Sequence, residues 1–213
     1  NISSKNANYC ELTGLYWAWK NLDADYIGLV HYRRYFTRKE VHSVEAKKEQ
    51  ILTGAEWEQL LSEYPVVVAD KRKYYIESNR SHYNHAHHAE GLDVAEQIIA
   101  EKYPEYSGAF TKVCNRNWAH MFNMFVMRRD LFNQYCEWMF SILEELEKRV
   151  DISDYDAYEA RIFGFVSEIL LDVWLEANNI NYKEQNVSFM EPQNWLKKGS
   201  SFVLRKFGLH SKG

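Results

Sequence analysis

Two adjacent arginines, Arg33 and Arg34, stand where their side chains could bind an anion. They follow an apolar run, residues 26–30, which predicts a short buried strand. Ligands bind beyond the carboxyl ends of strands in open α/β sheets, and the planar guanidinium group pairs well with phosphate oxygens. Phosphate binding and a surface ion pair with carboxylates are equally good interpretations of this spacing.

A polar stretch, residues 71–91, holds half of the eight histidines. They are His82, His85, His87 and His88. On a helix His82 and His85 would share a face, which permits metal coordination, but no cysteine and no HExxH pattern completes a zinc site. We favour imidazoles that bind hydroxyl or phosphate groups, with a metal site and a solvated surface as alternatives. The lack of apolar periodicity predicts a functional or mobile loop.

Glu168 is a candidate general base, because it lies in an otherwise apolar helical stretch beside Phe165 and Ile169. Burial without a cation would raise the pKa of its carboxyl group, and such a carboxylate can take a proton from a hydroxyl. A structural ion pair with Arg161 is the slightly better interpretation on composition alone.

The elements that would position these residues alternate between amphipathic helices and short apolar strands. The expected helices are residues 8–22, 44–64 (divided by a capping box at Thr53 and Glu56), 93–103, a segment around Phe110, 130–149 and 155–177. The expected strands are residues 26–30, 66–69, 121–127 and 180–182. The first three end at residues 31–34, 70–73 and 127–130, where a ligand is expected. This α/β pattern, without repeat or linker, predicts one domain over residues 1–213.

Composition excludes several classes of protein. The formal charge of −4 argues against a general nucleic-acid binder. The sequence has no GxGxxG, P-loop or GxSxG pattern, which argues against a nicotinamide-dependent enzyme, a P-loop protein and a serine hydrolase. Three cysteines, Cys10, Cys114 and Cys136, have no CxxC spacing and indicate buried, reduced thiols of a cytoplasmic protein. Aromatic residues form 15% of the chain, which indicates a ring-rich core or a ring-lined site.

The sequence predicts a soluble protein, because no apolar run is long enough to span a membrane. Residues 197–213 form a basic C-terminal tail that also carries apolar side chains. Contact with an anionic membrane surface and a solvated terminal helix are equally good interpretations of this tail.

Four segments, residues 1–22, 26–36, 121–127 and 161–168, carry a family resemblance. Through them the chain resembles the bacterial family catalogued as domain of unknown function 4422, whose members occur among capsular and exopolysaccharide glycosyltransferases. The resemblance implies a GT-A-like fold, which is a nucleotide-sugar-binding α/β sandwich with a mixed central sheet flanked by helices. It also implies an N-terminally incomplete domain, because family members begin with a further stretch that holds the first strand.

The same resemblance implies a glycosyltransferase that moves a sugar from a nucleotide-diphosphate donor, expected to be a UDP-sugar, to a glycan acceptor. The pathway would be capsular, exopolysaccharide or lipopolysaccharide biosynthesis, and some members are associated with galactofuranose transfer. Related enzymes hold a divalent metal through a DxD motif at a strand end, where this chain has residues 31–34, His-Tyr-Arg-Arg. The DxD match at residues 23–25 precedes the strand. We therefore assign no metal ligand, doubt metal dependence, and expect no cofactor besides the donor.

The resemblance and the spacing together suggest a role for individual residues. Arg33 and Arg34 would replace the metal's charge on the leaving diphosphate, and Glu168 would act as the base in an inverting reaction. The donor would be bound by Glu11, His31, Tyr32 and Asp70. Sugar hydroxyls or the acceptor would be bound by His82, His85, His88, Asp93 and Asn123.

Two alternatives from other classes stay open. One is a non-catalytic module that binds a glycan or a nucleotide through the same rings. The other is a metal-dependent sugar-phosphate transferase that uses the cluster from His82 to His88. In the favoured hypothesis the protein is cytoplasmic, its acceptor is lipid-linked, and its basic tail places it on the inner face of the plasma membrane.

Overall fold

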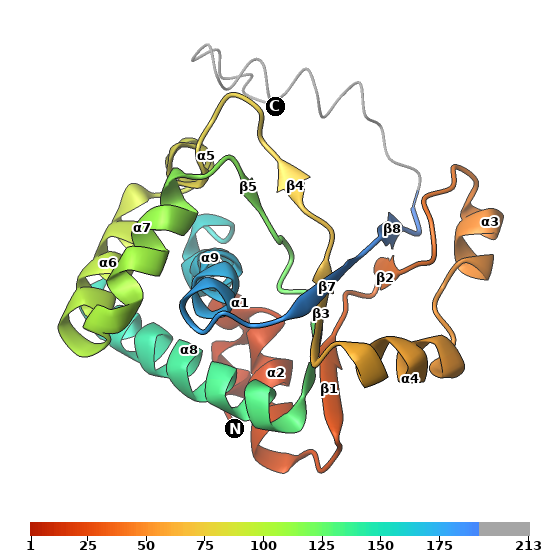
Figure 1. Cartoon of the computed structure of the whole chain (residues 1–213). Helices are drawn as coiled ribbons and strands as arrows, with labels where there is room; N and C mark the ends of the chain where they lie inside the picture. The colour runs from red at the N-terminus through yellow and green to blue at the C-terminus, as the bar shows by residue number, and fades with distance from the viewer. Residues whose placement is uncertain (192–213) are drawn as a thin grey trace.

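A four-stranded mixed sheet forms the centre of the chain, of which the computed structural model describes residues 1–191 (Figure 1). Its strands stand in the order β1 (Tyr26–Leu29), β6 (Phe125–Arg128), β3 (Val66–Ala69) and β7 (Tyr182–Gln185). β6 pairs antiparallel with both of its neighbours, whereas β3 and β7 are parallel. β1, β3 and β7 therefore run in one direction, and their carboxyl ends meet at one edge of the sheet.

Helices flank this sheet on both sides (Figure 1), which confirms the expected α/β class. On one side α8 (Arg129–Arg149) packs against β1 and β6, and α9 (Ile162–Ala177) packs against α8. The same layer contains α1 (Asn6–Tyr9), α2 (Leu12–Asn21), α5 (Asn79–Ala86), α6 (Ala89–Lys102) and α7 (Ser107–Asn115). On the other side α4 (Gly54–Glu63) packs against β3, and α3 (Val44–Glu49) precedes it.

Two small sheets extend from the carboxyl edge of the main sheet (Figure 1). β2 (Arg34–Phe36) pairs with β8 (Val187–Phe189), and β4 (Arg72–Lys73) pairs with β5 (Trp118–Ala119). Short 3-10 helices lie at Ser3–Lys5, Pro104–Tyr106 and Glu159–Arg161.

Many aromatic rings pack in the core between the sheet and the helices. The ring of Tyr135 in α8 lies 5.6 Å from that of Phe125 in β6 and 5.6 Å from that of Trp174 in α9. The helices also approach one another closely at Gly91 in α6, where an added Cβ would lie 2.6 Å from Ile162 Cδ1. A large share of the ring content therefore serves packing.

Several helices and strands begin at other residues than the sequence predicts. The helix expected over residues 8–22 is broken at Cys10, whose φ of 50° separates α1 from α2. The strand expected over residues 121–127 begins only at Phe125, because Phe122 and Asn123 have positive φ angles that an extended strand does not allow.

The later elements shift in the same way. The last helix begins at Ile162 rather than at residue 155, and the strand expected at residues 180–182 begins at Tyr182. The capping box of Thr53 and Glu56 is confirmed at the start of α4.

The polar stretch 71–91 is ordered, so the loop prediction is wrong. It contains β4, the whole of α5 and the start of α6. Ser78 caps α5 by accepting a hydrogen bond from the Ser81 N–H. Local capping and pairing with β5 supply the order that apolar periodicity did not indicate.

The third expected ligand-binding segment, residues 127–130, lies at the wrong edge of the sheet. β6 runs antiparallel to β1 and β3, so its carboxyl end points away from theirs. The segment that precedes β6, residues 121–124, occupies the ligand edge instead.

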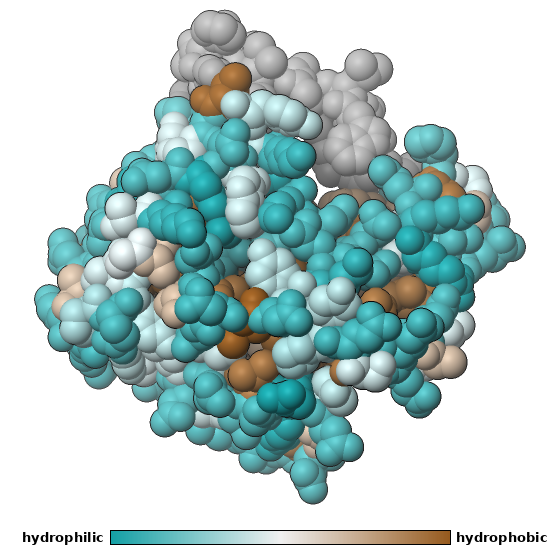
Figure 2. All heavy atoms as spheres, in the orientation of Figure 1, coloured by the Kyte–Doolittle hydropathy of each residue, from teal (hydrophilic) through white to brown (hydrophobic). Residues whose placement is uncertain are grey.

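No helix within residues 1–191 is long and apolar enough to cross a membrane. The face seen in Figure 2 is largely hydrophilic, with small apolar areas near its middle. The basic tail, residues 197–213, lies outside the described residues.

Candidate functional site

A large cleft of about 2320 Å³ opens at the carboxyl edge of the main sheet. It is lined by the β1–β2 and β3–β4 turns, the segment before β6, the α1–α2 junction, α5, α9 and β8. Ligand pockets commonly measure about 300–1,000 Å³, so this cleft has room for more than one ligand.

Most of the predicted site residues line this one cleft. They are Glu11, His31, Tyr32, Arg33, Arg34, Asp70, His82, His85 and Glu168. The residues of the prediction that do not line it are His88, Asp93 and Asn123.

His88 and Asp93 belong to the start of α6, which turns them toward other surface groups. His88 Nε2 lies 3.1 Å from Glu159 Oε1, and its ring stacks on Tyr155. Asp93 Oδ1 accepts a hydrogen bond of 2.6 Å from Arg80 Nη1. Neither side chain lines the cleft, and their contact with sugar stays a prediction.

Asn123 is buried beneath the cleft, where it orients other side chains. Its Nδ2 donates to Glu11 Oε1 at 2.9 Å, and its Oδ1 accepts from Ser167 Oγ at 3.1 Å. These bonds occupy the amide, so in this structure Asn123 supports the cleft from below, and its contact with sugar stays a prediction.

Glu168 reaches the cleft from α9, and the pKa of its carboxyl group is raised to about 7. Burial is the main cause, and the nearby charge of Glu11 adds to it. The positive charges of Arg34 and Arg72 and a hydrogen bond from the Phe122 N–H act in the opposite direction. Near neutral pH this carboxyl group is poised to accept or release a proton.

The ion pair considered between Glu168 and Arg161 is wrong. Arg161 Nε donates to Cys10 Sγ at 3.1 Å, and the guanidinium group lies 5.4 Å from the centroid of the Phe165 ring. Among the cations whose charge lowers the pKa of Glu168, Arg34 has the largest effect.

Arg34 is a half-buried cation held between two rings. Its guanidinium carbon lies 4.2 Å from the centroid of Phe122 and 5.0 Å from that of Phe189. Its buried Nε has no hydrogen-bond partner within residues 1–191. Burial lowers its pKa, but an arginine remains charged in proteins. A buried guanidinium group with an open donor fits an anionic ligand.

Arg33 differs from its neighbour, because it is exposed. Its Nη1 donates to Glu191 Oε2 at 3.0 Å, and its guanidinium group lies over the ring of Tyr32. It lies at the rim of the cleft rather than inside it.

Two histidines of α5 converge on one carboxylate that the sequence analysis missed. His82 Nδ1 lies 3.2 Å and His85 Nδ1 2.9 Å from the two oxygens of Glu77, which is buried. Helix spacing could not have indicated this contact, because Glu77 precedes Ser78, the residue that caps α5. At the other side of the cleft, His31 Nε2 lies 2.5 Å from the Phe122 carbonyl oxygen.

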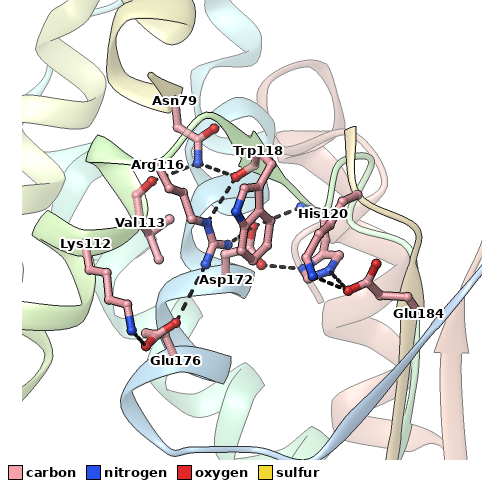
Figure 3. Close-up of polar contacts among 10 residues, drawn as sticks. Asn79, Lys112, Val113, Arg116, Trp118, His120, Asp172, Glu176 and Glu184 are labelled. Atoms are coloured by element: carbon pink, nitrogen blue, oxygen red, sulfur yellow. Dashed lines mark hydrogen bonds and ion pairs between the residues drawn. The ribbon is translucent and has the colours of Figure 1, made fainter. Parts of the chain in front are cut away.

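A buried polar network fixes the segment that leads into the cleft (Figure 3). Asp172 accepts hydrogen bonds from the His120 N–H at 2.9 Å and from His120 Nδ1 at 2.5 Å, and Arg116 Nη2 lies 2.6 Å from it. Burial opposes ionisation of Asp172, but the bonds from His120 and the charge of Arg116 hold its pKa below the usual value. α9 therefore anchors residues 120–124 through Asp172 as well as through Ser167.

The residues at the end of β1 do not fit Mg²⁺. This ion prefers carboxylate and other oxygen ligands, whereas this strand end presents an imidazole and two guanidinium groups. Within residues 1–191 no three His, Cys, Asp or Glu side chains are grouped closely enough to hold a metal ion. No step described below uses one.

Comparison with solved structures shows that the fold is glycosyltransferase-like. The chain is similar to a solved structure described as the apo form of the WbbM bifunctional glycosyltransferase, with a TM-score of 0.82 and 31% sequence identity. The match covers 89% of this chain and 38% of that one, so the chain spans well under half of that protein.

The family model of DUF4422, a domain of unknown function, matches residues 1–179, and the chain belongs to this family. A comparison with curated proteins finds no match.

Proposed function

We propose that this chain transfers a sugar from a nucleotide-diphosphate donor to a hydroxyl group of a glycan. One observation carries the proposal: a carboxyl group with a pKa of about 7, Glu168, and a half-buried cation with an open donor, Arg34, line the same cleft of a glycosyltransferase-like fold. A UDP-hexose, including UDP-galactofuranose, is the donor we favour, and a lipid-linked capsular, exopolysaccharide or lipopolysaccharide chain is the acceptor.

The reaction is a displacement at the anomeric carbon of the donor sugar. Glu168 takes the proton of the acceptor hydroxyl while the hydroxyl oxygen forms the new glycosidic bond. The bond from the anomeric carbon to the diphosphate oxygen breaks, and its electron pair leaves with the diphosphate. Arg34, with Arg33 nearer the rim, stabilises the added negative charge. Attack opposite the leaving group inverts the anomeric carbon.

The other lining residues divide between the two substrates. Glu11, His31, Tyr32 and Asp70 surround the carboxyl ends of β1 and β3 and would contact the donor. His82 and His85 line the α5 side of the cleft and would contact sugar hydroxyls. We place the reaction in the cytoplasm at the inner face of the plasma membrane, where a lipid-linked acceptor would be met.

A thermal-shift assay with UDP, GDP and CMP, each with and without manganese, tests donor binding. We expect at least one nucleotide to raise Tm because a ligand that binds the folded state stabilises it. Arg34→Ala should weaken that binding about 10- to 100-fold, whereas Arg33→Ala, which removes an exposed and paired cation, should weaken it about three-fold or less. Stabilisation by no nucleotide would overturn the proposal.

A second measurement separates transfer from binding alone. Release of UDP from UDP-hexoses is followed for the wild type and for Glu168→Gln, with an acceptor extract from capsule-forming bacteria. The variant should retain nucleotide binding and lose turnover. Binding without turnover in the wild type would favour the non-catalytic module, and strict dependence on manganese would favour the metal-dependent alternative.

A further inference from the structure

A cluster of rings lines the cleft together with Glu168, and one of the rings belongs to the same helix, α9. Phe165 stacks on His87 with centroids 3.8 Å apart, and Tyr158 lies 5.2 Å from Phe165. All three side chains line the cleft, and Tyr158 is 51% exposed. We call Tyr158, Phe165 and His87 the ring wall.

The ring wall stands at a fixed spacing from the proposed base. Phe165 and Glu168 are three residues apart on α9, so they share a helix face with Cβ atoms about 5–6 Å apart. A ligand bound against the exposed ring of Tyr158, which adjoins Phe165, would therefore lie near Glu168.

Polar groups line the same cleft as the ring wall. Thr13 Oγ1 donates to Asn6 Oδ1 at 3.0 Å, which orients the amide and leaves Asn6 Nδ2 available to a ligand. His82 and His85 line the cleft from α5. The combination of an aromatic face with donors and acceptors at its edge suits a pyranose, whose C–H groups lie over the electron-rich ring face while its hydroxyls bond sideways.

We propose that the ring wall is the subsite for the acceptor sugar, the terminal residue of a growing glycan. This inference rests on the proposed function, because the donor diphosphate at Arg34 and the base at Glu168 define the direction in which the acceptor must lie. The base takes its proton from the acceptor hydroxyl, so rings close to Glu168 suit the acceptor sugar better than the nucleoside. The cleft volume of about 2320 Å³ accommodates donor and acceptor together.

Saturation-transfer NMR with the methyl pyranosides of galactose, glucose and mannose tests the subsite on the whole chain. At least one glycoside should show saturation transfer to its ring protons with the wild type. Tyr158→Ala should weaken binding of that glycoside about ten-fold, and Tyr158→Phe should retain it, because the ring is kept. Trp17→Ala is the matched control, since Trp17 is also 51% exposed but does not line the cleft.

The affinity for UDP, measured by calorimetry on the same variants, distinguishes the outcomes. Unchanged UDP affinity in Tyr158→Ala together with loss of the glycoside signal supports the subsite. Loss of UDP affinity would overturn it and assign the rings to the nucleobase. A glycoside signal that survives Tyr158→Ala, or no signal from any glycoside with the wild type, would also overturn it. If glycosides bind and no nucleotide does, the proposed transfer fails, and the rings bind a glycan without serving an acceptor.

Discussion

The side-chain amide of Asn123 donates a hydrogen bond of 2.9 Å to Glu11 and so joins the segment before β6 to the α1–α2 junction. Glu11 in turn acts on the carboxyl group of Glu168 through its charge. A buried amide that does not line the cleft thereby holds in place a residue whose charge, after burial, helps to raise the pKa of the candidate base.

Asn123→Asp should destabilise the protein, because it sets a second carboxylate against Glu11 in a buried place. The expected loss in the free energy of unfolding is about 2 kcal/mol, measured by urea denaturation at pH 8. Adding Glu11→Gln restores a donor opposite the new carboxylate, so the double variant should recover most of the loss. Equal losses in the single and the double variant would show that the two side chains are not coupled.

Glu168 should make activity and stability depend on pH in opposite directions. As the base it must be ionised, so turnover should rise as the pH increases through about 7. The pKa of Glu168 is about 7 in the folded state and near 4.5 in the unfolded state, so the folded state holds this proton more tightly. The free energy of unfolding therefore falls as the pH rises from about 4.5 to about 7. Glu168→Gln should therefore be more stable than the wild type at pH 8, by about 2 kcal/mol, and no more stable near pH 4.5. An advantage independent of pH would contradict the raised pKa.

Asp172→Asn should lower the free energy of unfolding strongly. It leaves the guanidinium of Arg116 and the imidazole of His120 without their shared carboxylate (Figure 3), at a cost of about 3–5 kcal/mol. The pKa of Asp172 is held low, so its contribution is present above the pKa of the unfolded carboxyl group and is lost as the pH falls through the folded value. Glu176→Gln is the control: Glu176 lies 3.7 Å from Arg116 at a more exposed place, and its loss should cost about 1 kcal/mol or less. Calorimetry from pH 8 to pH 4 measures both variants.

Gly91→Ala should destabilise the protein although alanine is the better helix former. The new Cβ would lie 2.6 Å from Ile162 Cδ1 and 2.8 Å from Tyr83 Oη, an overpacking that costs about 1–3 kcal/mol. Gly108 occupies a similar place at the start of α7 with nothing within 4 Å of an added Cβ, so Gly108→Ala should be neutral or stabilising by up to about 1 kcal/mol. Thermal unfolding of both variants and the wild type under the same conditions measures these two changes in stability.

Local patterns in the sequence predicted the elements whose causes are local. The capping box of Thr53 and Glu56 and the fully buried β3 could be recognised because a few neighbouring residues determine each. The direction of β6 could not, since a short apolar run reads the same in either orientation. The helix and the strand within residues 71–91 could not be predicted from apolar periodicity, because a helix cap and the pairing of β4 with β5 stabilise them.

The candidate site was predictable where residues follow a strand end, as Arg34 and His31 do. It was not predictable where a distant segment supplies the environment. Nothing near Arg34 in sequence indicates that Phe189 covers it, and nothing near Glu168 indicates that Arg34 faces it. The surroundings of Asp93 and His88 could not be predicted for a related reason, because their partners Arg80 and Glu159 lie on other elements.

The pairing of β2 with β8 also has a consequence for the order of folding. Val66 in β3 pairs with Tyr182 in β7, and Arg34 pairs with Phe189, so these contacts join the first half of the chain to its late segments. Contacts of such sequence separation form slowly, because a long loop must close first. During synthesis the helices of the middle segment can pack before residues 182–189 leave the ribosome, whereas the environment of Arg34 cannot be completed until then. A nascent chain arrested before β7 should be compact and still unable to bind an anion at Arg34.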